Sequence, residues 1–192
     1  ESGRIARKFA QASGGKGEGF LIGDRVRAPA DLAAFANAIS SHSIEMDDVD
    51  VLALFHFSPP VVSAALASAE QQRASGKQLL AAIIAGCEMM ERLSNAANNS
   101  LRNRSFHTTP TCGVFGATVA AGTLLRLTEK KLASAFGLAG AQASGLMEMY
   151  GPSMQKRFNP GPAARNGVTA AAIANIGFTG TDTIFEGERG FL

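Results

Sequence analysis

The fold is decided by residues 105–119, which read Ser-Phe-His-Thr-Thr-Pro-Thr-Cys-Gly-Val-Phe-Gly-Ala-Thr-Val. Thr109 is suited to cap a helix and Pro110 to occupy its first turn. Beyond them, Gly113, Ala117 and Ala121 recur every four residues, which places them in one row along a helix. A row without bulky side chains lets a neighbouring backbone approach closely, so this stretch predicts a tightly packed helix.

Two later segments repeat this pattern of small residues. They contain Ala133, Gly137, Ala141 and Gly145, and then Ala163, Gly167 and Ala171. Because glycine inside a helix costs about 1 kcal/mol relative to alanine, so many glycines indicate a packing requirement. The same pattern occurs in membrane helices, but Arg, Lys, Glu and Gln are too frequent in the flanking segments here. We therefore predict an all-α fold, a helical bundle with tightly packed small-residue helices.

The remaining chain divides at about residue 28. Residues 1–28 are rich in glycine and charge and are predicted to form an N-terminal loop or connector, without the Gly-Lys-Ser/Thr pattern of a phosphate-binding loop. Residues 29–192 are predicted to form the helical domain, with helices over 30–40, from Pro59-Pro60 to Gly76, and over 77–98. In the last helix an apolar stripe is expected at Leu80, Ile83, Ile84, Cys87, Met90 and Leu93. No strand is predicted.

Composition narrows the classes of function. Hydrophobic residues make up 46% and charged residues 18% of the chain, as in a globular domain. A net charge of +2, one tyrosine and no tryptophan give little basis for binding nucleic acid. No apolar run is long enough to cross a bilayer, and no signal peptide is recognisable. Cys87 and Cys112 match no metal or redox spacing. Each lies in a helical apolar pattern, where a free buried cysteine is common, and this favours a reducing compartment, the cytoplasm or the mitochondrion.

The chain has three histidines, and two of them directly precede predicted helices. His56 stands before Pro59-Pro60, and His107 before Thr109-Pro110. Imidazole titrates near physiological pH, and a helix N-terminus attracts anions. The pair therefore points to acid–base chemistry on a carboxylate or phosphate; the alternative for each is a hydrogen-bonded structural role.

The third histidine begins an acidic segment. Residues 42–50 read His-Ser-Ile-Glu-Met-Asp-Asp-Val-Asp. Mutual repulsion among its four carboxylates tends to raise a pKa, which would suit Glu45 or Asp47 to a general base. The alternatives are a solvated acidic turn or an N-terminal cap for the next helix. No zinc, iron or calcium spacing is present, so no metal site is predicted.

A cationic loop completes the candidate residues. Residues 150–161 contain two prolines and two glycines around Lys156 and Arg157. Lysine can anchor a carboxylate, and arginine can bind one through two parallel hydrogen bonds. The alternative is ordinary exposed charge.

These segments together resemble the MmgE/PrpD family, which contains 2-methylcitrate dehydratases, cis-aconitate decarboxylases and an iminodisuccinate epimerase. Residues 42–48 look like the family's His-Ala-Leu-Asp-Phe-Asp-Asp segment, and Phe55-His56 with Ser58-Pro59 is similar to its His-Pro-Ser segment. Residues 106–117 resemble its Gly-Phe-His-Pro-Thr…Gly-x-Phe-Gly-Ala block. Further similar blocks follow in family order at 137–146, 156–167, 177–180 and 186–187.

The resemblance implies an all-α domain, a homodimer, and neither a metal nor an organic cofactor. It also implies a pocket lined by the acidic segment, His56, His107 and Lys156, and substrates that are small di- or tricarboxylates. The chain departs from the family pattern at Glu45, at Val49 and at Asn159, where a histidine often follows the lysine. The chain is under half the family's usual length, so the resemblance implies that the family's later α+β lid domain lies outside this sequence.

Our leading hypothesis is a lyase that dehydrates or decarboxylates a small polycarboxylate such as 2-methylcitrate or cis-aconitate. His107 and His56 would move protons or orient carboxylates, and Asp47 or Glu45 would act as base or as histidine partner. Lys156 would anchor a substrate carboxylate. Further substrate contacts are expected from Arg157, His42 and Thr108. The alternatives are an epimerase or isomerase of a small dicarboxylate, and a non-catalytic helical module for dimerisation.

Overall fold

Helices account for most of the computed structural model, which describes the backbone of residues 1–192 and all side chains except those of residues 98 and 99. The helices are α1 (Ser2–Ala12), α2 (Ala30–Ser41), α3 (Ser58–Gln72), α4 (Gly76–Asn103), α5 (Thr108–Leu124), α6 (Glu129–Gly140), α7 (Gln155–Phe158) and α8 (Pro160–Asn175). A 3-10 turn, η1 (Met147–Met149), lies between α6 and α7, and one antiparallel hairpin joins β1 (Gly19–Phe20) to β2 (Arg27–Ala28). The predicted all-α class is confirmed, with this hairpin as a small addition.

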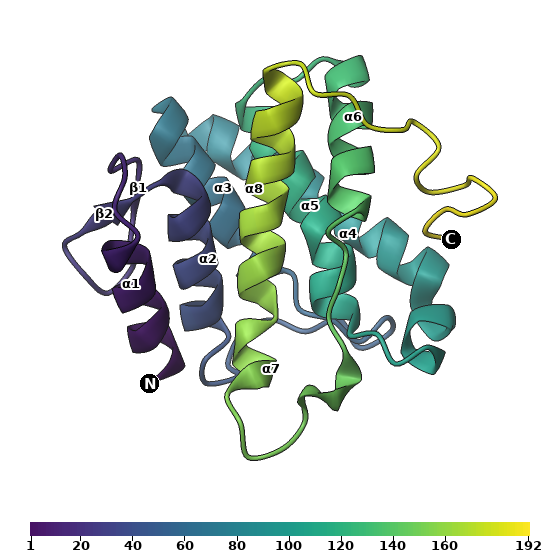
Figure 1. Ribbon diagram of the computed structural model, residues 1–192, viewed down its shortest axis with the longest axis horizontal. Helices are drawn as coiled ribbons and strands as arrows, with labels where there is room; N and C mark the ends of the chain where they lie inside the picture. Colours follow the sequence, from purple (N-terminus) through teal and green to yellow (C-terminus); the bar gives the residue numbers. More distant parts are fainter.

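Helix α5 forms the centre of the bundle. Sixteen of its residues are buried, because its surface is apolar or small on every side. It packs against α3, α4, α6 and α8. Figure 1 shows α8 crossing in front of α5, with α2 on one side and α6 on the other. Most of residues 105–119, which predicted a tightly packed helix, therefore belong to the core helix of the bundle.

Close backbone approach explains the small residues. A Cβ atom added to Gly116 of α5 would lie 2.8 Å from the carbonyl oxygen of Gly86 in α4. One added to Gly167 of α8 would lie 2.5 Å from the Cβ of Ala117. Any side chain at these crossings would push the helices apart, so the predicted packing requirement is confirmed for α5 and α8.

The row of small residues in α6 serves a different purpose. A Cβ on Gly137 would lie 2.7 Å from the backbone nitrogen of Thr181, in the segment after α8. The row therefore accommodates the returning chain beside the helix. Gly145 lies beyond the helix at φ +127°, where a side chain would also collide with Pro110.

Two local predictions need correction. Residues 1–28 are not a loop throughout, since α1 buries Gly3, Ala6 and Ala10 and the hairpin follows. The glycine-rich surroundings concealed that short buried face. In α4, Leu80 and Ile84 are 62% and 68% exposed, because the buried face of this helix runs through Ala82, Met90, Leu93 and Ala97.

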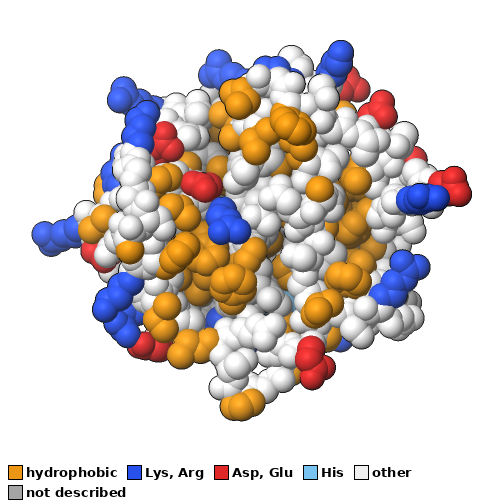
Figure 2. All heavy atoms as spheres, in the orientation of Figure 1, with side chains coloured by type: hydrophobic (Ala, Val, Ile, Leu, Met, Phe, Trp, Pro, Cys, Tyr) orange, Lys and Arg blue, Asp and Glu red, His pale blue; other side chains and the backbone are white. Residues whose placement is uncertain are grey.

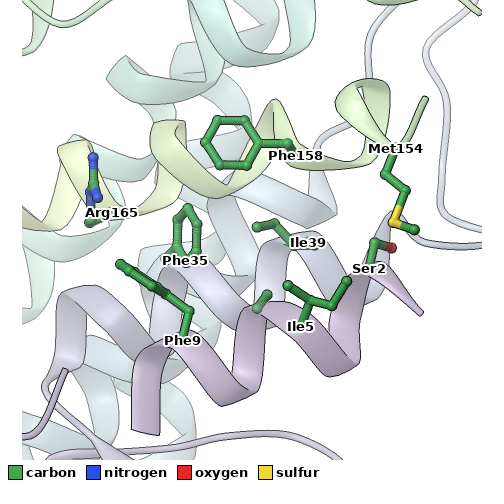
Figure 3. A pocket seen from close by; sticks show the side chains of 9 residues that line it. Ser2, Ile5, Phe9, Phe35, Ile39, Met154, Phe158 and Arg165 are labelled. Carbon is green, nitrogen blue, oxygen red and sulfur yellow. The ribbon is translucent and has the colours of Figure 1, made fainter. Parts of the chain in front are cut away.

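An apolar cavity of about 360 Å³ lies between α1, α2, α7 and α8. Figure 3 shows six large side chains that line it, Ile5, Phe9, Phe35, Ile39, Met154 and Phe158. Apolar side chains gather on this face of the molecule in Figure 2 as well. Among the helices whose residues are described, none combines the length and the apolar character needed to cross a membrane.

Candidate active site

The segment between α2 and α3 brings two histidines to one carboxylate. His42 ends α2 and is fully buried, and His56 precedes α3 and is 17% exposed. The Nδ1 atoms of the two rings lie 2.8 Å and 3.2 Å from the same oxygen of Asp47. The rings themselves stand edge to face, with centroids 4.7 Å apart. Asp47 is thereby the histidine partner that the sequence suggested.

The neighbouring Asp48 has a different task, which matches one of the alternatives raised for the acidic segment. Its carboxylate accepts hydrogen bonds from the backbone N–H groups of Phe57 and Ser58, at 2.9 and 3.0 Å. The N-terminus of α3 is therefore occupied by a carboxylate of the protein itself. Asp48 also uses its backbone carbonyl to accept a hydrogen bond from His56 Nδ1 at 2.7 Å.

His107 enters the same region from the start of α5. The helix begins at Thr108 with His107 in the N-cap position, so the prediction of Thr109 as N-cap is wrong. The earlier start follows from the chain pairing before it, since His107 N donates to the carbonyl of Gly145 at 2.9 Å. His56 is tied to this helix as well, because its backbone N–H donates to Thr109 Oγ1 at 3.1 Å.

Burial favours the neutral imidazole at two of the three histidines, His107 and His42. Burial is the main cause that lowers the pKa of His107 to about 3, and the positive charge of Lys156 acts in the same direction. Burial also lowers the pKa of His42, although the hydrogen bond to Asp47 opposes part of this effect. The Nε2 atom of His42 and the Oδ1 atom of Asp47 are buried without a hydrogen-bond partner among the described residues.

The cationic side of the site comes from α7. Lys156 pairs with one carboxylate oxygen of Glu45, and Arg157 lies 3.4 Å from the other. Burial acts to raise the pKa of Glu45, but the hydrogen bond and charge of Lys156, with the charges of His42 and Arg157, lower it overall. Glu45 adopts φ +56°, a left-handed backbone conformation that is uncommon outside glycine. In this structure both cations are therefore paired with a carboxylate of the protein itself.

The structure therefore gathers most of the predicted residues. His42, Asp47 and His56 form one cluster, Glu45, Lys156 and Arg157 form a second, and the charges of both act on His107. Thr108 is buried next to His107, and its Oγ1 has no hydrogen-bond partner among the described residues. The roles of these residues remain predictions.

One set of side chains has the chemistry to ligate a metal. Ligand atoms of His42, Asp47 and His56 lie within 4.8 Å of one another, a grouping that their sequence spacing did not indicate. A divalent ion bound there would act as a Lewis acid. Both imidazoles, however, use Nδ1 in hydrogen bonds within the protein, which leaves only their Nε2 atoms for a ligand.

Two residues at the site were not among the predicted site residues. Asn159 and Met149 are buried around His107, with Asn159 Nδ2 3.2 Å from His107 Nδ1. Asn159 was noticed only as a departure from the family pattern. Its spacing of three residues from Lys156 was the available signal, since it predicts a shared turn.

The two cysteines are not suited to nucleophilic catalysis. Burial raises the pKa of Cys87 to about 11 and that of Cys112 to about 12, so both remain thiols at neutral pH. Neither thiol has the depressed pKa of a cysteine nucleophile.

Fold and site together define a helical domain with a polar cluster of histidines, carboxylates and cations. The whole chain, residues 1–192, matches the family model described as the MmgE/PrpD N-terminal domain. The protein therefore belongs to the MmgE/PrpD family, which confirms the resemblance read from its motifs.

The individual relatives are named as cis-aconitate decarboxylases. The chain is 32% identical to a cis-aconitate decarboxylase-like protein, oryM, of Aspergillus oryzae over 88% of its own length and 37% of that protein. It is 32% identical to cis-aconitate decarboxylases of Aspergillus terreus, over 82% of its length and 34% of theirs, and of Homo sapiens, over 86% and 35%. The chain thus spans about a third of the length of these curated relatives.

Proposed function

We propose that this protein is a lyase that acts on a small di- or tricarboxylate by acid–base catalysis. One observation carries the proposal: the imidazoles of His56 and His107 and a lysine–arginine pair converge around the start of α5. The imidazoles can transfer protons, and the cations can bind carboxylates. The names of the relatives favour cis-aconitate as substrate and decarboxylation as reaction.

Substrate binding begins at the cations. A substrate carboxylate would replace Glu45 between Lys156 and Arg157, because the two groups have the same charge and the same hydrogen-bonding geometry. The remainder of a small polycarboxylate would then extend toward His56 and His107.

Proton transfer falls to the histidines. Asp47 lies against Nδ1 of His56, so it stabilises the imidazolium that forms when His56 accepts a proton. Positive charge at Lys156 and Arg157 stabilises negative charge that develops on the substrate carboxylate. In loss of water, His56 would take a proton from carbon, and the departing hydroxyl group would leave as water with a proton returned by the imidazolium. In loss of CO₂, protonated His56 would donate its proton to the carbon that keeps the electron pair of the broken C–C bond, and solvent would restore that proton.

The test compares substrates and variants of the intact protein. Release of CO₂ from cis-aconitate and loss of water from 2-methylcitrate are measured for wild type, His56→Ala and Lys156→Ala. We expect His56→Ala to lower kcat by about 10²-fold or more, as loss of a proton-transfer group does. We expect Lys156→Ala to act mainly through KM.

Arg92→Ala provides the control, because Arg92 pairs with the exposed Glu88 on α4, so this variant should turn over normally. Absence of both reactions in the wild type would contradict the proposal. Incorporation of solvent deuterium without either reaction would indicate the epimerase alternative, and absence of all three would favour the non-catalytic module.

A further inference from the structure

Asn159 contacts His107, which, unlike His42 and His56, has no carboxylate partner among the described side chains. It lies between α7 and α8, three residues after Lys156, and is 8% exposed. Its Nδ2 atom lies 3.2 Å from His107 Nδ1 and 2.8 Å from the sulfur of Met149. His107 and Met149 are themselves 5% and 1% exposed, so the contact is closed to solvent.

The methionine sulfur determines which way the amide of Asn159 faces. A thioether can accept a hydrogen bond but cannot donate one, so the NH₂ group must face Met149. The same NH₂ group faces His107, and it can only donate there. His107 Nδ1 must therefore carry a lone pair, which places the proton of the neutral ring on Nε2.

His56 has the opposite arrangement. Its Nδ1 lies 2.7 Å from the backbone carbonyl of Asp48, which can only accept, so Nδ1 carries the proton. The lone pair of His56 is then on Nε2. The Nε2 atoms of the two rings consequently differ. Nε2 of His107 is an N–H donor, and Nε2 of His56 is a proton acceptor.

We propose that Asn159 is a positioning residue that fixes His107 as an Nε2–H hydrogen-bond donor and thereby leaves His56 as the proton acceptor of the site. This inference rests on the proposed function for its catalytic meaning, but the tautomer itself does not. Burial of His107, which lowers its pKa to about 3, agrees with a ring that stays neutral and keeps a single proton. His107 would then bind a substrate carboxylate oxygen and stabilise the charge that develops on it.

The tautomer can be measured directly by nuclear magnetic resonance of the intact protein labelled with ¹⁵N-histidine. The His107 signals are assigned by their loss in His107→Gln. We expect Nδ1 of His107 to resonate as an unprotonated nitrogen and Nε2 as a protonated one. The reverse assignment in the wild type would overturn the inference without any variant.

Asn159→Asp tests the cause of this tautomer. A carboxylate at position 159 can only accept, so it should move the proton of His107 to Nδ1. Asn166→Asp is the matched control, because it adds the same charge on α8 next to Arg165 and should leave the His107 signals unchanged. An unchanged tautomer in Asn159→Asp would contradict the positioning role. If that variant does not fold, the wild-type spectrum decides.

Turnover separates this inference from the proposed function. Asn159→Asp should lower kcat for cis-aconitate by about 10²-fold, and Asn166→Asp should not. The expected tautomer in a wild type that turns over neither substrate would support the positioning role and contradict the lyase. Turnover by a wild-type protein with the reversed tautomer would support the lyase and contradict the positioning role.

Discussion

At the scale of single residues, each histidine of the site takes its chemistry from the groups that contact its ring. Asp47 pairs with His42 and His56, the carbonyl of Asp48 fixes Nδ1 of His56, and Asn159 contacts His107. The imidazoles are alike as residue types, yet these neighbours give them different roles. The groups around each imidazole, rather than its residue type, therefore determine its role in the site.

The burial of His107 has a consequence for stability. Its pKa is about 3 in the folded protein and 6.5 for the unperturbed group, so between these values the unfolded chain binds a proton that the folded one does not. Stability should therefore fall as pH decreases below 6.5. At pH 5 this contribution amounts to about 2 kcal/mol relative to neutral pH.

Urea unfolding at pH 7 and pH 5 tests this prediction. We expect His107→Gln to lose less stability on acidification than the wild type, because the variant lacks the titrating group. His42, whose pKa is also lowered, contributes with the same sign in both proteins. Equal losses in wild type and variant would contradict the prediction.

Glu45 should compete with the substrate for the cations. We expect Glu45→Gln to bind citrate roughly two- to fivefold more tightly, since partly exposed ion pairs of this kind contribute up to about 1 kcal/mol. Isothermal titration calorimetry measures the affinity. Glu88→Gln on α4 is the control, because Glu88 pairs with Arg92 at an exposed helix surface. Weaker citrate binding in Glu45→Gln would show that this carboxylate supports binding.

Sequence reasoning found the chemical groups of the site but not their pairing. His56 and His107 were recognised because a histidine directly before a helix start suits proton transfer and anion binding. His42 and Lys156 were recognised from their residue types within an acidic and a cationic segment. That His42 and His56 share one oxygen of Asp47 could not be predicted, because the turn of residues 43–57 has no periodicity. The partnership of Asn159 with His107 spans 52 residues and depends on the packing of α5 against α8.

At the scale of elements, the helix crossings depend on glycine. We expect Gly116→Ala to destabilise the protein by about 1–3 kcal/mol although alanine is the better helix former, because the added Cβ would meet the carbonyl of Gly86. Gly76→Ala is the matched control, since nothing lies within 4 Å of the Cβ position there. Thermal or urea unfolding of both variants measures the difference. Equal stability would contradict the crossing as described.

The elements themselves could be predicted to different degrees. The small-residue rows identified α5 and α8 as close-packed helices, because only packing explains glycine at those positions. Helix α1 was missed, since its buried face consists of Gly3, Ala6 and Ala10, which give no apolar signal. Leu80 and Ile84 were assigned to a buried face that lies elsewhere on α4, because apolar residues occur on both sides of that helix.

At the scale of the whole molecule, the site lies where separate parts of the chain meet. Residues 42–56, the start of α5 and the segment around α7 each contribute a part, and only the folded bundle brings them together. The chain corresponds to about a third of the length of its curated relatives. The proposals on substrate and reaction therefore concern the intact protein. A homodimer, implied by the family resemblance, remains a proposal that light scattering can test.

The release of CO₂ from cis-aconitate by the intact protein is the most direct test of the central claim. The account predicts release by the wild type, a loss of about 10²-fold in His56→Ala, and normal release in the surface variant Arg92→Ala. Release that is equal in the wild type and His56→Ala would contradict the assignment of the histidine cluster as the site of a carboxylate lyase.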